Sequence, residues 1–216
     1  MKRRAFTLAE VLTVSFLLLC VLGLVWSVMV PTFRMYAFSQ SRLQVRQSAI
    51  QALYRLTTEI QNTVPEALTL VQAPTTGVPV ALSLVELDQF SVSGAFSWHQ
   101  GFEIFYFDKP SEKVLWRRIK PPGYDFAQAA PPNLLIADMV SIIDGTTLSN
   151  SGEKRVVAIN VDKCTIQDAV PGDAFLTFPI TISIDTRIEE STDPLTRKAT
   201  EIFHLESQVV PRSKRW

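Results

Sequence analysis

One long apolar run at the start of the chain limits what this sequence can fold into. From Phe6 to Val30 the only ionisable side chains are Glu10 and the thiol of Cys20. A bilayer-spanning α-helix needs about 20 mostly apolar residues, so the run is long enough to cross a membrane. Three basic residues at positions 2–4 precede it, and such charges tend to stay in the cytoplasm. The sequence therefore predicts a single-pass protein whose larger part lies outside the cytoplasm.

A secretory signal peptide is the ordinary explanation for such a start, but it fits poorly. The apolar run is longer than a signal core, and residues 26–31 contain no clear small-x-small cleavage site. Glu10 is also unexpected, because an acid costs about 2.5–3.5 kcal/mol at the centre of a membrane helix. In the simplest interpretation, Glu10 lies at the headgroup level and favours a helix N-terminus. Otherwise the carboxylate needs a partner.

Residues 4–10, Arg-Ala-Phe-Thr-Leu-Ala-Glu, resemble the processing and methylation site of type IV prepilins and of type II secretion pseudopilins. In that family a short basic leader is removed before a Phe, and an acid stands fifth in the mature chain. The resemblance implies cleavage between Ala5 and Phe6 by a prepilin peptidase, with N-methylation of Phe6. Glu10 is fifth counted from Phe6. Ala5 departs from the Gly that is commonest before the cut, and Ala9 from the usual apolar residue.

Cleavage at this site would place a new amine at Phe6, one helical turn from Glu10. If the amine of one subunit met Glu10 of its neighbour, the buried pair would fix the register of apolar helices packed side by side. The resemblance thus implies a minor pilin or pseudopilin, with Glu10 as its assembly residue, in a filament for protein secretion, pilus function or DNA uptake. The implied location is the cytoplasmic (inner) membrane, then a periplasmic or cell-surface filament.

The implied partners are other pilin or pseudopilin subunits, the prepilin peptidase, an inner-membrane assembly platform with its ATPase, and membrane lipid. The alternative is a single-pass, membrane-anchored binding module that never polymerises. Such a module would need neither Glu10 nor cleavage after Ala5.

The remaining pattern predicts an α+β fold, with a long N-terminal helix packed on an antiparallel β-sheet. After a leader at residues 1–5, residues 6–30 form its membrane half and residues 31–64 an amphipathic half that ends at Val64-Pro65. Its apolar face is expected to hold Leu43, Ile50, Leu53, Leu56, Ile60 and Val64. Residues 65–216 are expected to form one β-rich domain. Strands are expected near residues 78–85, 102–107, 114–119, 139–143, 156–161, 176–184 and 202–210. The turn-forming residues 108–113 are expected to join the second and third of these strands in a hairpin. Pro179 is expected to place its strand at a sheet edge or a bulge.

The sequence contains few residues arranged as in known catalytic or metal-binding motifs. His99 and His204 are the two histidines, and neither lies in a nucleophile or metal-ligand motif, so we expect no enzyme activity, metal or cofactor. Asp185, Glu189, Glu190 and Asp193 are a minor calcium hypothesis, although their spacing does not match a calcium loop.

A basic and aromatic group around residues 116–124 could in principle stack bases of a single strand. However, Arg117 and Arg118 should point to opposite faces of a strand, so nucleic acid is not an expected partner. The cysteines, Cys20 and Cys164, are expected to stay unpaired because they lie in different environments.

Overall fold

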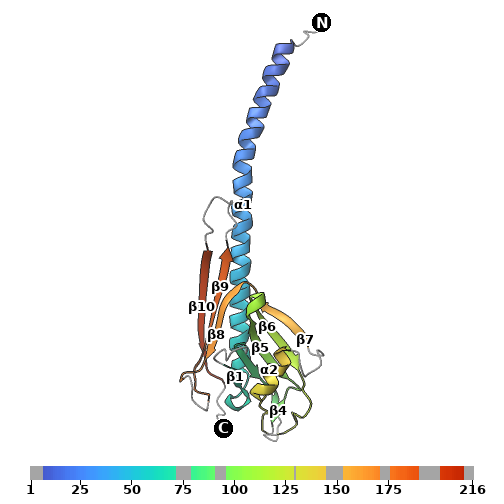
Figure 1. Ribbon diagram of the computed structural model, residues 1–216, viewed down its shortest axis with the longest axis vertical. Coiled ribbons are helices and arrows are strands. Elements are labelled where there is room, and N and C mark those ends of the chain that lie inside the picture. The colour runs from blue at the N-terminus through green and yellow to red at the C-terminus, as the bar shows by residue number, and fades with distance from the viewer. Residues whose placement is uncertain are drawn as a thin grey trace. The chain divides into compact units, whose positions relative to one another are not determined.

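The computed structural model describes residues 7–71, 79–90, 96–128, 130–144, 153–170, 176–189 and 200–211 of the 216-residue chain. The chain forms two compact units that meet in sequence between Leu43 and Gln44. One helix, α1 (Leu8–Gln61), makes up the described part of the first unit and continues into the second (Figure 1). The predicted α+β class, with a long N-terminal helix and antiparallel sheets, is confirmed.

Helix α1 covers most of both predicted helical segments without interruption and includes Pro31. It ends at Gln61, shortly before Val64-Pro65, where the restricted residue before proline favours extended backbone. Val64 is indeed extended, and the short 3₁₀ helix η1 (Pro65–Ala67) follows it.

The buried face of α1 agrees with the predicted one only in part. Leu56 and Ile60 are buried as expected, and so is Val64 just beyond the end of the helix. Leu43 and Ile50 were expected to face the core, yet 57% and 51% of these side chains are exposed. The buried positions are Val45, Ala49, Ala52, Leu56 and Ile60. The prediction followed the largest apolar residues, whereas the helix presents two alanines to the sheets.

A five-stranded antiparallel sheet, in the order β1-β2-β5-β6-β7, forms one part of the second unit. Its strands are β1 (Thr69–Val71), β2 (Ala81–Leu84), β5 (Phe102–Asp108), β6 (Lys113–Ile119) and β7 (Glu153–Ala158). The predicted hairpin is present: β5 and β6 pair through η2 (Lys109–Ser111), and Glu112 takes the left-handed conformation, φ 51°.

A second antiparallel sheet has the order β10-β9-β8, with β8 (Val161–Gln167), β9 (Ile180–Glu189) and β10 (Thr200–Val209). The expectation that Pro179 would lie in an edge strand or a bulge is wrong. Strand β9 is the central strand of this sheet and begins at Ile180, so the proline lies outside the ladder and removes no hydrogen bond from it. A short pair, β3 (Leu87–Phe90) and β4 (Phe96–Trp98), completes the described strands.

Two further strand predictions are corrected. The single strand expected over 156–161 is the end of β7 and the start of β8, because Asn160 at φ 55° turns the chain from one sheet into the other. The strand expected over 139–143 is instead a helix, α2 (Ile136–Asp144). Met139 and Ile142, three residues apart, are its buried side chains, which is helical rather than strand spacing.

Two hydrophobic clusters lie on opposite faces of the five-stranded sheet. The first joins the buried face of α1 to Phe105 and Trp116 of this sheet and to the inner residues of the β10-β9-β8 sheet. The second joins α2 to Phe102, Ile104 and neighbouring apolar residues on the opposite face. Strand β5 is therefore buried on both faces, which explains its almost continuous aromatic and apolar sequence.

Candidate functional site at the start of α1

Of the predicted processing and assembly residues, Glu10 is the one that the structure describes. Ala5 and Phe6 fall outside the described residues, which begin at Thr7. Glu10 lies in the first turn of α1. The geometry of the candidate site is therefore that of Glu10 and its surroundings.

Thr7 and Glu10 form a reciprocal pair at the helix start. The backbone N–H and the hydroxyl of Thr7 donate to Oε2 of Glu10 at 2.9 and 3.0 Å. In return, the backbone N–H of Glu10 donates to Oγ1 of Thr7 at 3.4 Å. This is a capping box, in which two side chains satisfy backbone donors that the first helical turn leaves free. Glu10 therefore has a role within a single chain: it stabilises the start of α1.

The capping role of Thr7 was missed in the sequence, although its signal was present there. Thr7-Leu8-Ala9-Glu10 is a Thr-x-x-Glu pattern directly before an apolar run, which is the sequence signature of a capping box. The simpler interpretation, in which Glu10 favours a helix N-terminus, agrees with this geometry.

The capping box uses only one oxygen of the carboxylate. Both bonds from Thr7 end on Oε2, and Oε1 has no hydrogen-bond partner among the residues that the structure describes. A carboxylate can accept about four hydrogen bonds, so Glu10 keeps acceptor capacity while it caps the helix. Chemically, the arrangement could bind a cation such as an amine at Oε1.

Three other hydroxyl groups in the apolar part of α1 donate hydrogen bonds within the helix. Thr13 donates to the carbonyls of Ala9 and Glu10, both at 3.0 Å. Ser27 and Thr32 likewise donate to carbonyls of the preceding turn, at 2.8 and 2.7 Å. Such back-bonding hides polar groups from an apolar environment. Glu10 is thus the one charged side chain between Thr7 and Phe33.

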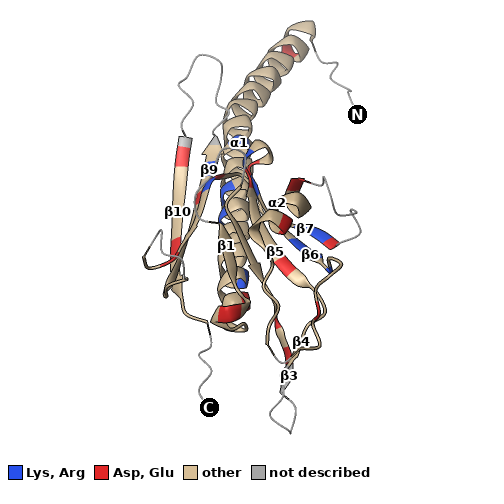
Figure 2. Ribbon diagram, turned by 60° about the horizontal axis from the view of Figure 1, so that its bottom comes forward, with Lys and Arg blue, Asp and Glu red and all other residues tan. Residues whose placement is uncertain are grey.

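Helix α1 is, among the described residues, the one helix long and apolar enough to cross a membrane by length and composition. A signal sequence and a core helix of a soluble protein can meet the same criterion, but a core helix is mostly buried. In contrast, no residue in the most apolar stretch of α1 is buried. In Figure 2 this part of the helix is tan except for one acidic position near its N-terminal end. An exposed apolar surface of this kind is typical of a segment that contacts lipid or another protein.

The two histidines, which lie in no catalytic or metal-ligand motif, both belong to the second unit. His204, on β10, contacts Oδ1 of Asp185 through Nδ1 at 2.5 Å and lies 3.5 Å from Glu206. The hydrogen bond to Asp185 is the main cause that raises the pKa of His204 above its ordinary value. His99 precedes the Gly101 turn, and its backbone N–H donates to the carbonyl of Glu86.

The calcium hypothesis finds no assembled site in the described residues. No group of three or more His, Cys, Asp or Glu side chains there could hold a metal ion. Asp185 lies inside β9 and contacts His204, whereas Glu190 and Asp193 fall outside the described residues. The side chain of Glu189, at the end of β9, is likewise not described.

The basic residues near Trp116 do not form one surface. Arg117 is buried and donates to the carbonyl of Ile142, while Arg118 binds Glu103. The two arginines therefore serve opposite faces of β6, as the alternation of a strand predicts. Lys120 donates to Gln100, and its Nζ lies 6.0 Å from the centre of the Phe126 ring.

No family model, curated protein or solved structure matches this chain. The long apolar helix and antiparallel sheets are compatible with a pilin-like fold.

Proposed function

We propose that this chain is a minor pilin-like or pseudopilin-like subunit, anchored in a cytoplasmic membrane by α1. It assembles through that helix into an extracytoplasmic filament that serves protein secretion, pilus function or DNA uptake. The observation that carries the proposal is Glu10, the one charged side chain between Thr7 and Phe33 in the exposed apolar part of α1. Its Oε1 has no hydrogen-bond partner among the residues that the structure describes.

The chemistry of the preceding residues supports this proposal. Removal of the leader between Ala5 and Phe6 by a prepilin peptidase would leave an amine at Phe6, and N-methylation would keep its positive charge. An amine and a carboxylate in lipid compensate each other, because either charge alone is costly there. Oε1 of Glu10 offers the place for an amine of a neighbouring subunit, without loss of the capping box.

The second half of α1 also supports assembly through the helix. From Gln44 to Gln61 the charged side chains, Arg46, Arg55 and Glu59, are half-buried, and each has an oppositely charged partner. The positions that face solvent are uncharged, and Gln47, Ile50 and Tyr54 follow the three-and-four spacing of a helix–helix contact. A solvent-facing helix surface is usually charged, so this stripe suits contact with another helix.

The decisive experiment separates the two roles of Glu10. Glu10→Gln removes the charge but keeps an oxygen that can accept the bonds from Thr7, since Gln also serves in capping boxes. Thr7→Ala removes the cap but keeps the charge. We expect Glu10→Gln to insert and be cleaved without entering a filament, and Thr7→Ala to assemble. Filament recovery and the mass of the N-terminal peptide measure both steps.

Processing has its own control in the same experiment. Mass spectrometry of the wild-type protein should show methylated Phe6 as the first residue, and Ala5→Leu should block cleavage. Normal assembly of Glu10→Gln, or of uncleaved Ala5→Leu, would contradict the proposal.

The capping box favours one alternative: a membrane-anchored binding module that does not polymerise. In such a module the only role of Glu10 would be to cap α1 together with Thr7, and no neighbouring subunit would be needed. For this alternative, Glu10→Gln should leave every property of the protein nearly unchanged.

A further inference from the structure

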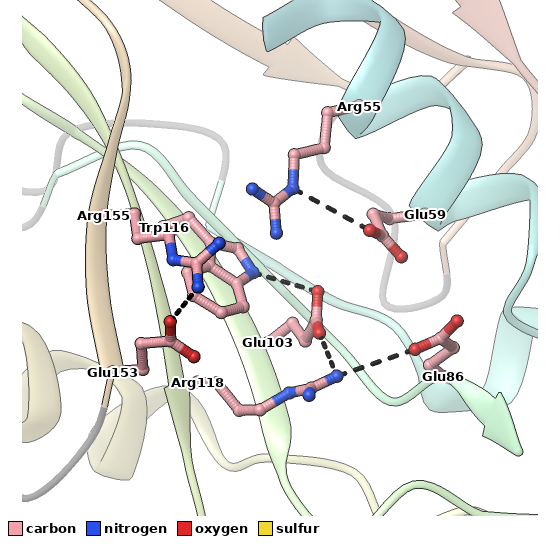
Figure 3. Close-up of polar contacts among 8 residues, drawn as sticks. All are labelled: Arg55, Glu59, Glu86, Glu103, Trp116, Arg118, Glu153 and Arg155. Carbon is pink, nitrogen blue, oxygen red and sulfur yellow. Dashed lines mark hydrogen bonds and ion pairs between the residues drawn. The ribbon is translucent and has the colours of Figure 1, made fainter.

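A cluster of charged side chains lies between the end of α1 and the five-stranded sheet. Figure 3 shows Arg55 and Glu59 on the helix, facing Glu103 of β5 and Arg118 of β6. Glu86, in the link between β2 and β3, completes the group. Five charged groups from the helix, the sheet and a connecting segment thus meet at one place in the second unit.

Glu103 is the best-satisfied member of this cluster. Its side chain is only 4% exposed. Oε1 accepts a hydrogen bond from Nη2 of Arg118 at 2.5 Å, and Oε2 accepts one from Nε1 of Trp116 at 2.9 Å. The same Nη2 of Arg118 lies 3.6 Å from Glu86. Arg118 is therefore shared by two carboxylates, so its positive charge compensates a third carboxylate only weakly.

The negative charge of Glu59 is compensated much less well than that of Glu103. Its side chain is 17% exposed, and its nearest cation is Nε of Arg55 at 3.9 Å. Arg55 also lies over the Trp116 ring, with its guanidinium carbon 4.6 Å from the ring centre. Among the described residues Glu59 accepts no hydrogen bond, so its charge lacks the donors that stabilise Glu103.

The charges of the cluster do not balance when every acid is ionised. Three carboxylates, Glu59, Glu86 and Glu103, then face the two guanidinium groups of Arg55 and Arg118. Beyond Trp116, Arg155 and Glu153 of β7 pair with each other and add no net charge. Uptake of one proton would equalise the charges, and Glu59 is the acid with the poorest compensation.

The ionisation of Glu59 reflects this geometry. Burial is the main cause that raises its pKa from 4.5 to about 7, and the carboxylates of Glu103 and Glu86 raise it further. Arg55 and Arg118 act in the opposite direction without cancelling these effects. The charged groups that act on Glu59 therefore come from α1 itself, from β5 and β6, and from the link between β2 and β3.

We propose that Glu59 is a proton-operated latch that controls how firmly the last turns of α1 are held on β5 and β6. With a neutral Glu59 the cluster is balanced and the helix end packs on the sheet. With an ionised Glu59 an uncompensated negative charge lies in the packed layer and weakens it. This latch does not depend on filament assembly, because every residue in it belongs to one chain.

The direction of the pH dependence follows from proton binding. Unfolded Glu59 titrates near 4.5 and folded Glu59 near 7, so the folded state binds more protons between these values. The stabilisation from the neutral form is complete below about pH 4.5. It decreases as pH rises and is lost once the pH exceeds about 7.

The test is thermal unfolding of the full chain in detergent between pH 5 and pH 8.5. We expect the melting temperature of the wild type to fall as pH rises toward about 7 and to level off above it, with the midpoint of the fall between the two pKa values. Glu59→Gln should remove most of that fall. Hydrogen exchange at the end of α1 should show the same difference locally. The matched control is Asp88→Asn, an exposed acid on β3 with no charged partner among the described residues. It should keep the wild-type pH dependence.

A second variant keeps the proposal testable if Glu59→Gln unfolds. Glu86→Gln removes a repelling carboxylate and frees Arg118 from one of its partners, so it should move the midpoint to lower pH. The proposal is overturned if Glu59→Gln has the pH profile of the wild type. It is equally overturned if Glu86→Gln leaves the midpoint in place.

Discussion

The adjacent residues Arg117 and Arg118 of β6 make contacts on opposite faces of the five-stranded sheet. Arg118 points toward the α1 side of the sheet and binds Glu103. Arg117 is 5% exposed and points to the other side, where its Nη1 donates to the carbonyl of Ile142 at 2.5 Å. Ile142 lies near the end of α2, where a positive charge interacts favourably with the helix dipole. The guanidinium of Arg117 thus fixes the end of a helix that sequence patterning did not predict.

Substitution of Arg117 by Met should therefore weaken α2 specifically. Methionine keeps the unbranched stem but leaves the buried carbonyl of Ile142 without this donor, at a cost of about 1–3 kcal/mol in unfolding free energy. Denaturant unfolding measures the loss, and amide exchange within α2 locates it. Lys154→Met is the control, because Lys154 is exposed and pairs with Arg117 across the strands. Equal stability losses in the two variants would contradict this role of Arg117.

Thr7 and Glu59 differ in how far their contacts could be predicted from the sequence. Thr7 and Glu10 are three residues apart, so the capping box could have been predicted from local sequence. The environment of Glu59 could not, because its repelling partners, Glu86 and Glu103, come from distant parts of the chain. Only the local pair between Arg55 and Glu59 was predictable from helical spacing, and it is present at 3.9 Å.

Helix α1 achieves close packing in the second unit through small residues on its buried face. Ala49 and Ala52 are completely buried in the cluster that contains residues of both larger sheets. Larger apolar residues such as Ile50 lie on the exposed side. The helix backbone can approach the strands closely because the alanine side chains occupy little space.

Ala52→Leu should therefore destabilise the second unit even though it adds apolar surface. Three extra carbon atoms must fit where no exposed space exists, and overpacking of this kind costs about 1–3 kcal/mol. The neighbouring substitution Gln51→Leu places the same side chain at an exposed position of the same helix and is the control. Chemical denaturation should show a lower midpoint for Ala52→Leu alone; an unchanged midpoint would mean that the core contains unexpected space.

Elements defined by local signals were predictable, and elements defined by tertiary contacts were not. The hairpin of β5 and β6 has a turn-forming link between two apolar runs, and it forms where expected. Helix α2 was taken for a strand because its apolar residues fit either period over such a short stretch. Its helical form is accompanied by contacts from elsewhere: Tyr124 binds Asp138 and the N–H of Leu135, and Arg117 binds its last turn.

The two units of the chain differ in how their apolar side chains are buried. In the first unit the apolar side chains of α1 are exposed, whereas in the second unit one face of the same helix is buried. The thiols show the same contrast: Cys20 is exposed and Cys164 is buried, and both are free. Burial raises the pKa of Cys164 to about 12, so its reactive thiolate scarcely forms at neutral pH.

This contrast allows a cross-linking experiment on the proposed assembly face of the intact protein. Cysteine at Ile50, in a chain with Cys20→Ala, can carry a maleimide-linked photoreactive group, while Cys164 stays unlabelled because it is buried. If the proposed filament forms, illumination of membranes should attach a neighbouring subunit at this position, since the group lies on the uncharged stripe of α1. The measurement is the mass of the adduct.

Two comparisons make this cross-link specific. Val156→Cys places the same group at an exposed position of β7, away from the stripe, and should give little adduct. Addition of Glu10→Gln to the Ile50→Cys chain should abolish the adduct, because the neighbour is held there only if the carboxylate has brought the two helices into register. An adduct that persists in the Glu10→Gln chain would show that the exposed stripe binds a partner independently of the membrane half. The charge at Glu10 would then have no part in assembly, and its capping of α1 would be its whole function.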